Sequence, residues 1–262
     1  MDLHLKNKII IVTGGAKGIG EGIVKVLAAE GAIPVIIGRN KADNQRVVEA
    51  IEQAGGKASY VVAELTDPSA SKHAVDQVIK THGKIDGVVN NAGVNDGVGL
   101  ENGNYEKFMA SIHKNLVHYY LIVHHALPFL KETHGAIVNI SSKTADTGQG
   151  GTSAYAASNG GRNALTREWA VDLLPFGIRV NAIIVAECFT PLYANWVAQF
   201  PDPQAKLKEI ESKIPLGNRM TTAEEIGNTT AFLLSDRSSH TTGQLLYVDG
   251  GYVHLDRALL HE

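Results

Sequence analysis

Two side chains in the middle of the chain, Ser142 and Tyr155, could together handle a proton on the oxygen of an alcohol. Oxidising an alcohol by loss of hydride leaves a proton on that oxygen, so a base must lie within hydrogen-bonding distance of it. A tyrosine can act as this base only if a nearby positive charge lowers its pKa, which is about 10 for the free side chain. The pair therefore predicts acid–base chemistry at an alcohol or carbonyl carbon, with the serine polarising the oxygen.

A glycine-rich turn follows the first apolar stretch of the chain, residues 8–13. The turn contains Gly14 and Gly18, and a helical pattern begins at Ile19 and Gly20. Glycines let the backbone turn sharply and approach a pyrophosphate, and the free N–H groups of a helix start point at the anion. A glycine-rich run alone could be a plain tight turn, but its place between a strand and a helix predicts dinucleotide binding.

Four motifs in the same order resemble the short-chain dehydrogenase/reductase family. The turn has the family's T-G-x-x-x-G-x-G spacing, residues 90–93 read N-N-A-G, Ser142 and Tyr155 stand at the family's interval, and Asn115 precedes them on a long helical pattern. The resemblance covers residues 5–252 and implies an NAD(P)-dependent oxidoreductase. It implies catalytic roles for Ser142, for Tyr155 as general base or acid, and for Asn115 as the anchor of a water or proton relay. It also implies cofactor contacts at Gly14, Gly18, Ile19, Gly20, Asn91, Ala92, Gly93, Tyr155 and Asn159.

The sequence departs from the family at one position of this machinery. Family members have a lysine four residues after the tyrosine, where its charge supports a tyrosinate, and this chain has Asn159 there. Asn159 can still donate a hydrogen bond to the nicotinamide ribose, but it carries no charge. The chain could be a weakened or silent relative that binds dinucleotide or sugar, a structural subunit, or a protein with a deliberate substitution. Alternatively Arg162, seven residues after Tyr155 on the same helix face, could supply charge, although that turn more often meets a neighbouring subunit.

The end of the second predicted strand bears on the choice between NAD and NADP. An acidic residue there accepts hydrogen bonds from the ribose hydroxyls of NAD, whereas a basic residue binds the 2′-phosphate of NADP. This chain has Gly38 followed by Arg39, which favours NADP over NAD. Glu64 matches the family's acidic position that reads the adenine amino group, and Leu65 beside it is expected at the same cofactor site.

Several polar segments resemble one branch of the family, the bacterial L-fucose dehydrogenases, which oxidise the anomeric carbon to a lactone. Polar side chains near the expected site suit a polyhydroxylated ligand better than a steroid or acyl chain. Trp196 is a packing residue by default and a possible sugar-stacking residue. The expected substrate contacts are Asn95, Ser142, Lys143, Gln149, Tyr155, Glu187 and Trp196. A small sugar such as L-fucose, or another small alcohol, is therefore the expected substrate.

Alternating apolar patterns must position these residues. Short β-branched runs alternate with helical patterns along the whole chain, which predicts an α/β fold with a doubly wound parallel sheet, the Rossmann fold, and helices on both faces. The predicted strands are 8–13, 35–37, 59–62, 88–89, 136–140, 180–185 and 244–248, and the predicted helices are 19–30, 47–54, 70–82, 105–132, 154–174 and 223–234. We expect a single domain over 1–262, with its least regular stretch, 189–214, forming a lid over the substrate.

Composition excludes several function classes. The 262 residues are 44% hydrophobic and 19% charged with a net charge of −3, so no positive field favours nucleic acid. The single cysteine, Cys188, and the absence of an apolar signal near the start of the chain predict a cytoplasmic protein with no membrane segment. The histidines near 113–134 lack metal-ligand spacing, so we expect no metal. The family resemblance implies a homotetramer.

Overall fold

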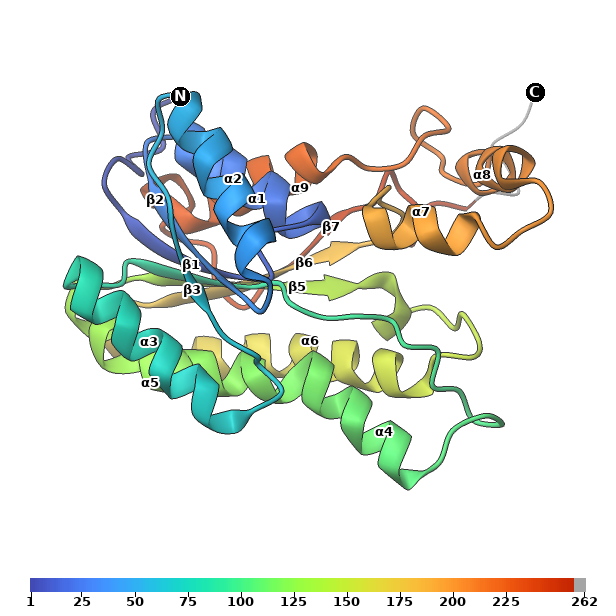
Figure 1. Cartoon of the computed structure of the whole chain (residues 1–262), viewed down its shortest axis with the longest axis horizontal. Helices are drawn as coiled ribbons and strands as arrows, with labels where there is room; N and C mark the ends of the chain where they lie inside the picture. Colours follow the sequence, from blue (N-terminus) through green and yellow to red (C-terminus); the bar gives the residue numbers. More distant parts are fainter. Residues whose placement is uncertain (257–262) are drawn as a thin grey trace.

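The computed structural model describes residues 1–256, in which seven parallel strands form one sheet (Figure 1). The spatial order is β3-β2-β1-β4-β5-β6-β7. The strands are β1 (Ile9–Thr13), β2 (Ile33–Gly38), β3 (Ser59–Val62), β4 (Gly87–Asn90), β5 (Ala136–Ser142), β6 (Arg179–Val185) and β7 (Leu245–Val248). This confirms the predicted doubly wound parallel sheet.

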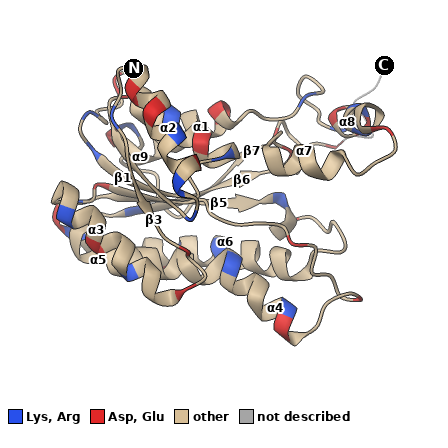
Figure 2. Ribbon diagram, in the orientation of Figure 1, with Lys and Arg blue, Asp and Glu red and all other residues tan. Residues whose placement is uncertain are grey.

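Helices cover both faces of the sheet, as Figure 1 shows. One layer contains α1 (Gly18–Ala29), α2 (Lys41–Gln53) and α9 (Ala223–Leu234). The other contains α3 (Pro68–His82), α4 (Tyr105–Ile112), α5 (His118–Thr133) and α6 (Ser153–Leu173). Both layers carry acidic and basic residues on their ribbons, consistent with the small net charge (Figure 2).

Burial on both faces explains why the strands are continuous apolar runs rather than alternating ones. Every residue of β1 is buried. Ile10 and Val12 belong to the apolar core under α1, α2 and α9, whereas Ile9 and Ile11 belong to the core under α3, α5 and α6. Successive side chains of a strand point to opposite faces, so a sheet covered on both sides needs apolar residues at every position.

The central strand β1 pairs with β2 on one side and with β4 on the other. The chain therefore continues from β1 toward one edge of the sheet and from β4 toward the other edge. The two connections separate, which opens a crevice at the carboxyl ends of β1 and β4. Ligands of doubly wound sheets bind in such a crevice. The glycine-rich turn after β1 and residues 90–93 after β4 both lie there.

The structure differs from the sequence prediction in the segment expected to form a lid. The stretch 189–214, expected to be the least regular, contains α7 (Pro191–Val197) and α8 (Pro203–Glu211). Both are short helices that begin with a proline after a capping residue, Thr190 or Asp202, and such short elements show little apolar periodicity.

Another difference lies in the long helical pattern over 105–132. The structure divides it into α4 and α5, joined by a π-helical turn, η1 (His113–Val117).

None of the helices in residues 1–256 is long and apolar enough to cross a membrane.

Candidate active site

Ser142 and Tyr155 come from adjoining elements at the carboxyl end of the sheet. Ser142 is the last residue of β5, and Tyr155 lies in the first turn of α6, each half-buried. The Ser141 hydroxyl donates a hydrogen bond to the backbone carbonyl of Asn159 at 3.3 Å, which joins the end of β5 to the second turn of α6. The Ser142 hydroxyl accepts from the Thr144 backbone N–H at 3.3 Å, so its own hydrogen remains available to a substrate oxygen.

Asn115 is fully buried in the π-helical turn η1 and joins two segments of the site. Its side-chain amide donates to the Ser111 carbonyl at 3.0 Å, and its side-chain oxygen accepts from the Val94 N–H at 2.8 Å. These bonds hold the loop after β4 against the helix. Helical turns of this wide type occur frequently at functional sites, because they break the regular backbone pairing.

The Arg162 side chain points into the protein, where its guanidinium lies between η1, β5 and α6. It is 3% exposed. It donates to the Asn115 backbone carbonyl from Nε at 2.8 Å and from Nη2 at 2.5 Å, to the Ile140 carbonyl at 3.2 Å, and to Asn159 Oδ1 at 2.9 Å. Asn159 Nδ2 in turn donates to the Tyr155 carbonyl at 2.8 Å. The Arg162 side chain is thus buried within its own chain.

The glycine-rich turn fits the pyrophosphate of a dinucleotide. Gly14 has a φ of +65°, and a Cβ on it would lie 3.0 Å from the Ala92 Cα, so only glycine keeps this approach open. The Thr13 hydroxyl accepts from the N–H groups of Asn91 at 2.9 Å and Ala92 at 3.1 Å, which joins the turn to the loop after β4. No side chain caps the start of α1, whose N–H groups are left for an anion.

The remaining glycine-turn positions lie at the same crevice. A Cβ on Gly20 would collide with the Gly14 carbonyl, and Ile19 packs against the core beneath α1. A Cβ on Gly18 would lie 3.0 Å from the Thr190 side chain, so the segment before α7 crosses this turn. Gly93, after β4, is exposed, but a Cβ there would lie 2.8 Å from the Arg162 guanidinium.

Arg39 and Glu64 meet at the rim of the crevice, after β2 and β3. Arg39 Nη1 lies 3.4 Å from Glu64 Oε2, and the Arg39 side chain is 81% exposed. Leu65 beside them is buried. An exposed ion pair of this kind contributes little to stability, so Arg39 can move to a phosphate at low cost.

A buried ion pair joins the ends of β5 and β6 on the substrate side. Lys143 Nζ contacts Glu187 Oε1, and it lies 4.0 Å from the centre of the Tyr252 ring. Tyr193 on α7 is hydrogen-bonded to Glu187, and burial together with that carboxylate raises the pKa of Tyr193. The predicted positions Lys143 and Glu187 are therefore in contact with each other and with two aromatic side chains.

Trp196 belongs to a row of aromatic rings along the 189–200 segment. Its ring centre lies 5.3 Å from that of Tyr193 and 5.1 Å from that of Phe200. The row continues from Tyr193 to Phe189 at 6.2 Å. Trp196 packs within this row and is 42% exposed.

Asn95 and Gln149 are exposed on two loops beside the site. Asn95 accepts a hydrogen bond from the Gly97 N–H at 3.3 Å, and neither residue hydrogen-bonds to Lys143 or Glu187 within residues 1–256. Tyr193 and Tyr252, which contact Glu187 and Lys143, were not among the residues expected at the site. Tyr252 directly follows the Asp-Gly-Gly turn after β7, and that position at the carboxyl end of a strand was a usable signal.

The potentially reactive side chains of Cys188 and His118 are both buried. Cys188 is buried, and burial raises the pKa of its thiol to about 12, so it is not a nucleophile at neutral pH. His118, the first residue of α5, is buried, and its Nε2 lies 2.9 Å from the Lys114 carbonyl in η1.

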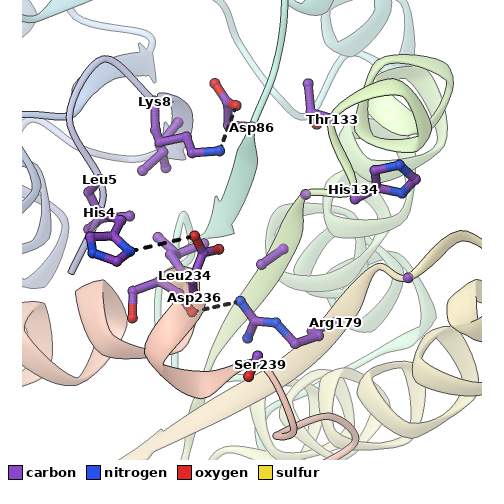
Figure 3. Close-up of a pocket in the computed structure, with 15 residues that line it drawn as sticks. His4, Leu5, Lys8, Asp86, Thr133, His134, Arg179, Leu234, Asp236 and Ser239 are labelled. Atoms are coloured by element: carbon purple, nitrogen blue, oxygen red, sulfur yellow. Dashed lines mark hydrogen bonds and ion pairs between the residues drawn. The ribbon is translucent and has the colours of Figure 1, made fainter.

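A cavity of about 250 Å³ lies at the opposite end of the sheet (Figure 3). Its charged residues already have partners: Lys8 lies 3.4 Å from Asp86, and Arg179 donates to the Ser235 carbonyl at 3.0 Å. Because this end carries the amino ends of the strands, it is not where the fold places a ligand.

Comparisons with known proteins agree with this geometry. The sequence model of the family described as "Enoyl-(Acyl carrier protein) reductase" matches residues 14–253. The chain is 34% identical to the 3-oxoacyl-[acyl-carrier-protein] reductase FabG of Thermotoga maritima, over 96% of this chain and 100% of that protein. It is 32% identical to the L-fucose dehydrogenase of Bos taurus, over 96% and 91%. The crystal structure of the Cj0485 dehydrogenase is 46% identical and superposes with a TM-score of 0.94 over 100% of both chains.

Proposed function

The chain belongs to the short-chain dehydrogenase/reductase family of NAD(P)-dependent oxidoreductases, and from this premise we propose that it oxidises a small sugar, L-fucose or a related aldose, to its lactone. The observation that carries the substrate class is the buried Lys143–Glu187 pair, with Tyr193 and Tyr252 against it. Charged groups can hydrogen-bond to the hydroxyl groups of a sugar, and the neighbouring aromatic rings can pack against the apolar face of its ring.

Tyr155 and Ser142 perform the proton chemistry in this proposal. The Ser142 hydroxyl donates to the substrate oxygen and holds it, and the Tyr155 oxygen takes the proton as the carbon–oxygen double bond forms. A dinucleotide held at the glycine-rich turn by Gly14 and Gly18 would supply the hydride acceptor. Asn115 fixes the loop after β4 beside the reacting groups, through its 2.8 Å bond to Val94.

Glu187 gives the site its selectivity in this proposal. A carboxylate can accept hydrogen bonds from two sugar hydroxyls, and a site built to do so rejects a ligand that lacks them. Asn95 and Gln149, on the two exposed loops, and Trp196, in the aromatic row, border the remainder of the ligand. The 189–214 segment with α7 and α8 acts as the lid, since Thr190 already crosses the glycine-rich turn.

NADP is the preferred cofactor in this proposal, because Arg39 lies at the rim where a 2′-phosphate would reach it. The proposed assembly is a homotetramer in the cytoplasm. Exposed apolar side chains on α5 and α6, namely Tyr120, Val171 and the following Leu174, offer surface for subunit contacts. Sedimentation of the purified protein tests the subunit count.

The test is steady-state reduction of NADP⁺ and NAD⁺ with a panel of aldoses, run beside hydroxysteroids and hydroxyacyl thioesters. L-fucose or a close aldose should give the highest kcat/KM, and Tyr155→Phe should abolish turnover while still binding the nucleotide. A thermal shift with steroids or acyl thioesters but with no aldose would refute the sugar assignment. Nucleotide binding without turnover of any substrate would favour the alternative that Asn159 first suggested, a catalytically impaired binding relative.

A further inference from the structure

The buried Arg162 side chain is a cation with no anionic partner among residues 1–256. Within residues 1–256 the arginine makes no ion pair, and its donors go to two backbone carbonyls and to the neutral Asn159 side chain. The guanidinium carbon also lies 4.3 Å from the centre of the Tyr119 ring. A charge removed from water at such a site is costly unless it is paired or serves a purpose.

Two successive hydrogen bonds, through Asn159, link this charge to the backbone of Tyr155. Arg162 Nη1 donates to Asn159 Oδ1 at 2.9 Å, and Asn159 Nδ2 donates to the Tyr155 backbone carbonyl at 2.8 Å. Asn159 thus connects the guanidinium to the turn of α6 that bears the phenol. The same guanidinium holds the Asn115 carbonyl with two donors, so it also fixes the π-helical turn on the opposite side of the site.

The other titratable groups around Arg162 do not compete for its charge at neutral pH. His118 on α5 stays neutral, because burial and the nearby Arg162 charge lower its pKa to about 4. Burial raises the pKa of Tyr119, also on α5, and its hydroxyl donates to the Ile140 carbonyl at 2.9 Å. Glu64, after β3, is paired with Arg39 at the rim. Tyr155, on the same helix as Arg162, is the half-buried phenol of the candidate active site.

We propose that Arg162, positioned by Asn159, supplies the positive charge that Tyr155 needs to act as a base. Arg162 is a positioning and electrostatic residue, since its guanidinium contacts Asn159 and Asn115 rather than the substrate. Low local polarity strengthens the attraction between a buried cation and a developing phenolate. This inference rests on the proposed role of Tyr155 in the oxidoreductase reaction, but not on the identity of the sugar.

The experiment compares Arg162→Met with the double variant Arg162→Met/Asn159→Lys, which returns a cation one turn after Tyr155. In NADP⁺ reduction with L-fucose, Arg162→Met should lower kcat/KM at neutral pH by about 10²-fold, the lower range of general acid–base effects. The deficit should shrink toward alkaline pH. The added lysine should restore at least about tenfold of the loss and move the rising limb of the pH profile back. Arg167→Met, which removes an exposed arginine from the same helix, is the matched control and should behave as wild type.

A second readout needs no substrate. The ultraviolet difference between each protein and its Tyr155→Phe counterpart reports ionisation of this phenol as pH rises. Arg162→Met should move that titration to higher pH, and the added Asn159→Lys should reverse the move. If L-fucose is not turned over by wild type but the titration shifts as stated, the sugar assignment fails and the role of Arg162 stands.

A different substitution covers the case in which Arg162→Met does not fold. Asn159→Asp keeps the size of the side chain and places a carboxylate beside the guanidinium, so it offsets the charge without removing it. It should move the phenol titration to higher pH in the same way. Equal loss of activity at every pH without rescue by the lysine would make Arg162 a purely structural residue, and an unshifted titration in Arg162→Met or Asn159→Asp would overturn the proposal.

Discussion

The Lys143 ammonium and the Glu187 carboxylate form a buried ion pair across the carboxyl ends of β5 and β6. The two side chains are 9% and 14% exposed. They stand forty-four positions apart in the sequence, and parallel pairing of the two strands brings them together, because Ser142 and Val185 are register partners just before them. A charged pair in this position can form hydrogen bonds to a ligand while the ammonium and the carboxylate still neutralise each other.

Removing one member of this pair should destabilise the protein more than removing both. Glu187→Gln leaves the Lys143 charge buried without its partner, a loss of about 3 to 5 kcal/mol, whereas Lys143→Met/Glu187→Gln should recover most of that loss. Urea denaturation of the two variants measures the difference. The double variant should still fail to respond to L-fucose in a thermal shift. Equal stability of the single and double variants would refute the stabilising role of the pair, and a retained response to the sugar would refute its binding role.

The glycine-rich turn provides a matched pair of substitutions. Gly14→Ala should weaken nucleotide binding at least about tenfold, because a Cβ there would lie 3.0 Å from Ala92 and the residue has a φ of +65°. Gly55→Ala imposes the same kind of backbone strain at a φ of +82° but meets nothing within 4 Å. Fluorescence titration with NADPH should show weakened binding for Gly14→Ala alone, although both variants lose stability. Equal affinities in the two variants would mean that the turn does not hold the nucleotide.

Local patterns were sufficient to predict the strands and most of the helices. The runs in β1 and β3 and the helical pattern of α9 predicted those elements to within a residue, because each is a regular apolar pattern with clear ends. The helix α2 was predicted to begin at residue 47, yet it starts at Lys41. The buried side chain of its first turn is the polar Asn44, so this turn carries no apolar periodicity, and the cap formed by Asn40 marks the start.

The candidate site was less predictable where its contacts are long-range. Spacing predicted Ser142, Tyr155 and the glycine-rich turn, since these motifs are local. It could not decide the direction of the Arg162 side chain, because that depends on packing of α6 against η1 and β5. Tyr193 and Tyr252 reach Glu187 and Lys143 from distant segments, and no spacing rule in the sequence connects them.

Cofactor preference should depend on Arg39. Replacing it by alanine removes a charge-assisted hydrogen bond to a 2′-phosphate, worth about 1.5 to 3 kcal/mol, and should raise the Kd for NADP about tenfold or more while leaving that for NAD nearly unchanged. Calorimetric titration of both nucleotides measures the two constants. Lys57→Ala removes an exposed charge at the other end of the sheet and is the control. If wild type binds NAD more tightly than NADP, the assigned preference is wrong.

Acid sensitivity of the fold should be traceable in part to His118. Burial lowers the pKa of this histidine to about 4 from the ordinary 6.5, so the unfolded chain binds a proton that the folded protein refuses. The resulting loss of stability begins as pH falls below about 6.5 and continues to about 4; between pH 7 and pH 5 it should be about 2 kcal/mol. His118→Gln should flatten this slope in urea denaturation measured across that range, even if it lowers stability at pH 7. The exposed His240→Gln should leave the slope as in wild type. An unchanged slope in His118→Gln would show that other groups cause the acid sensitivity.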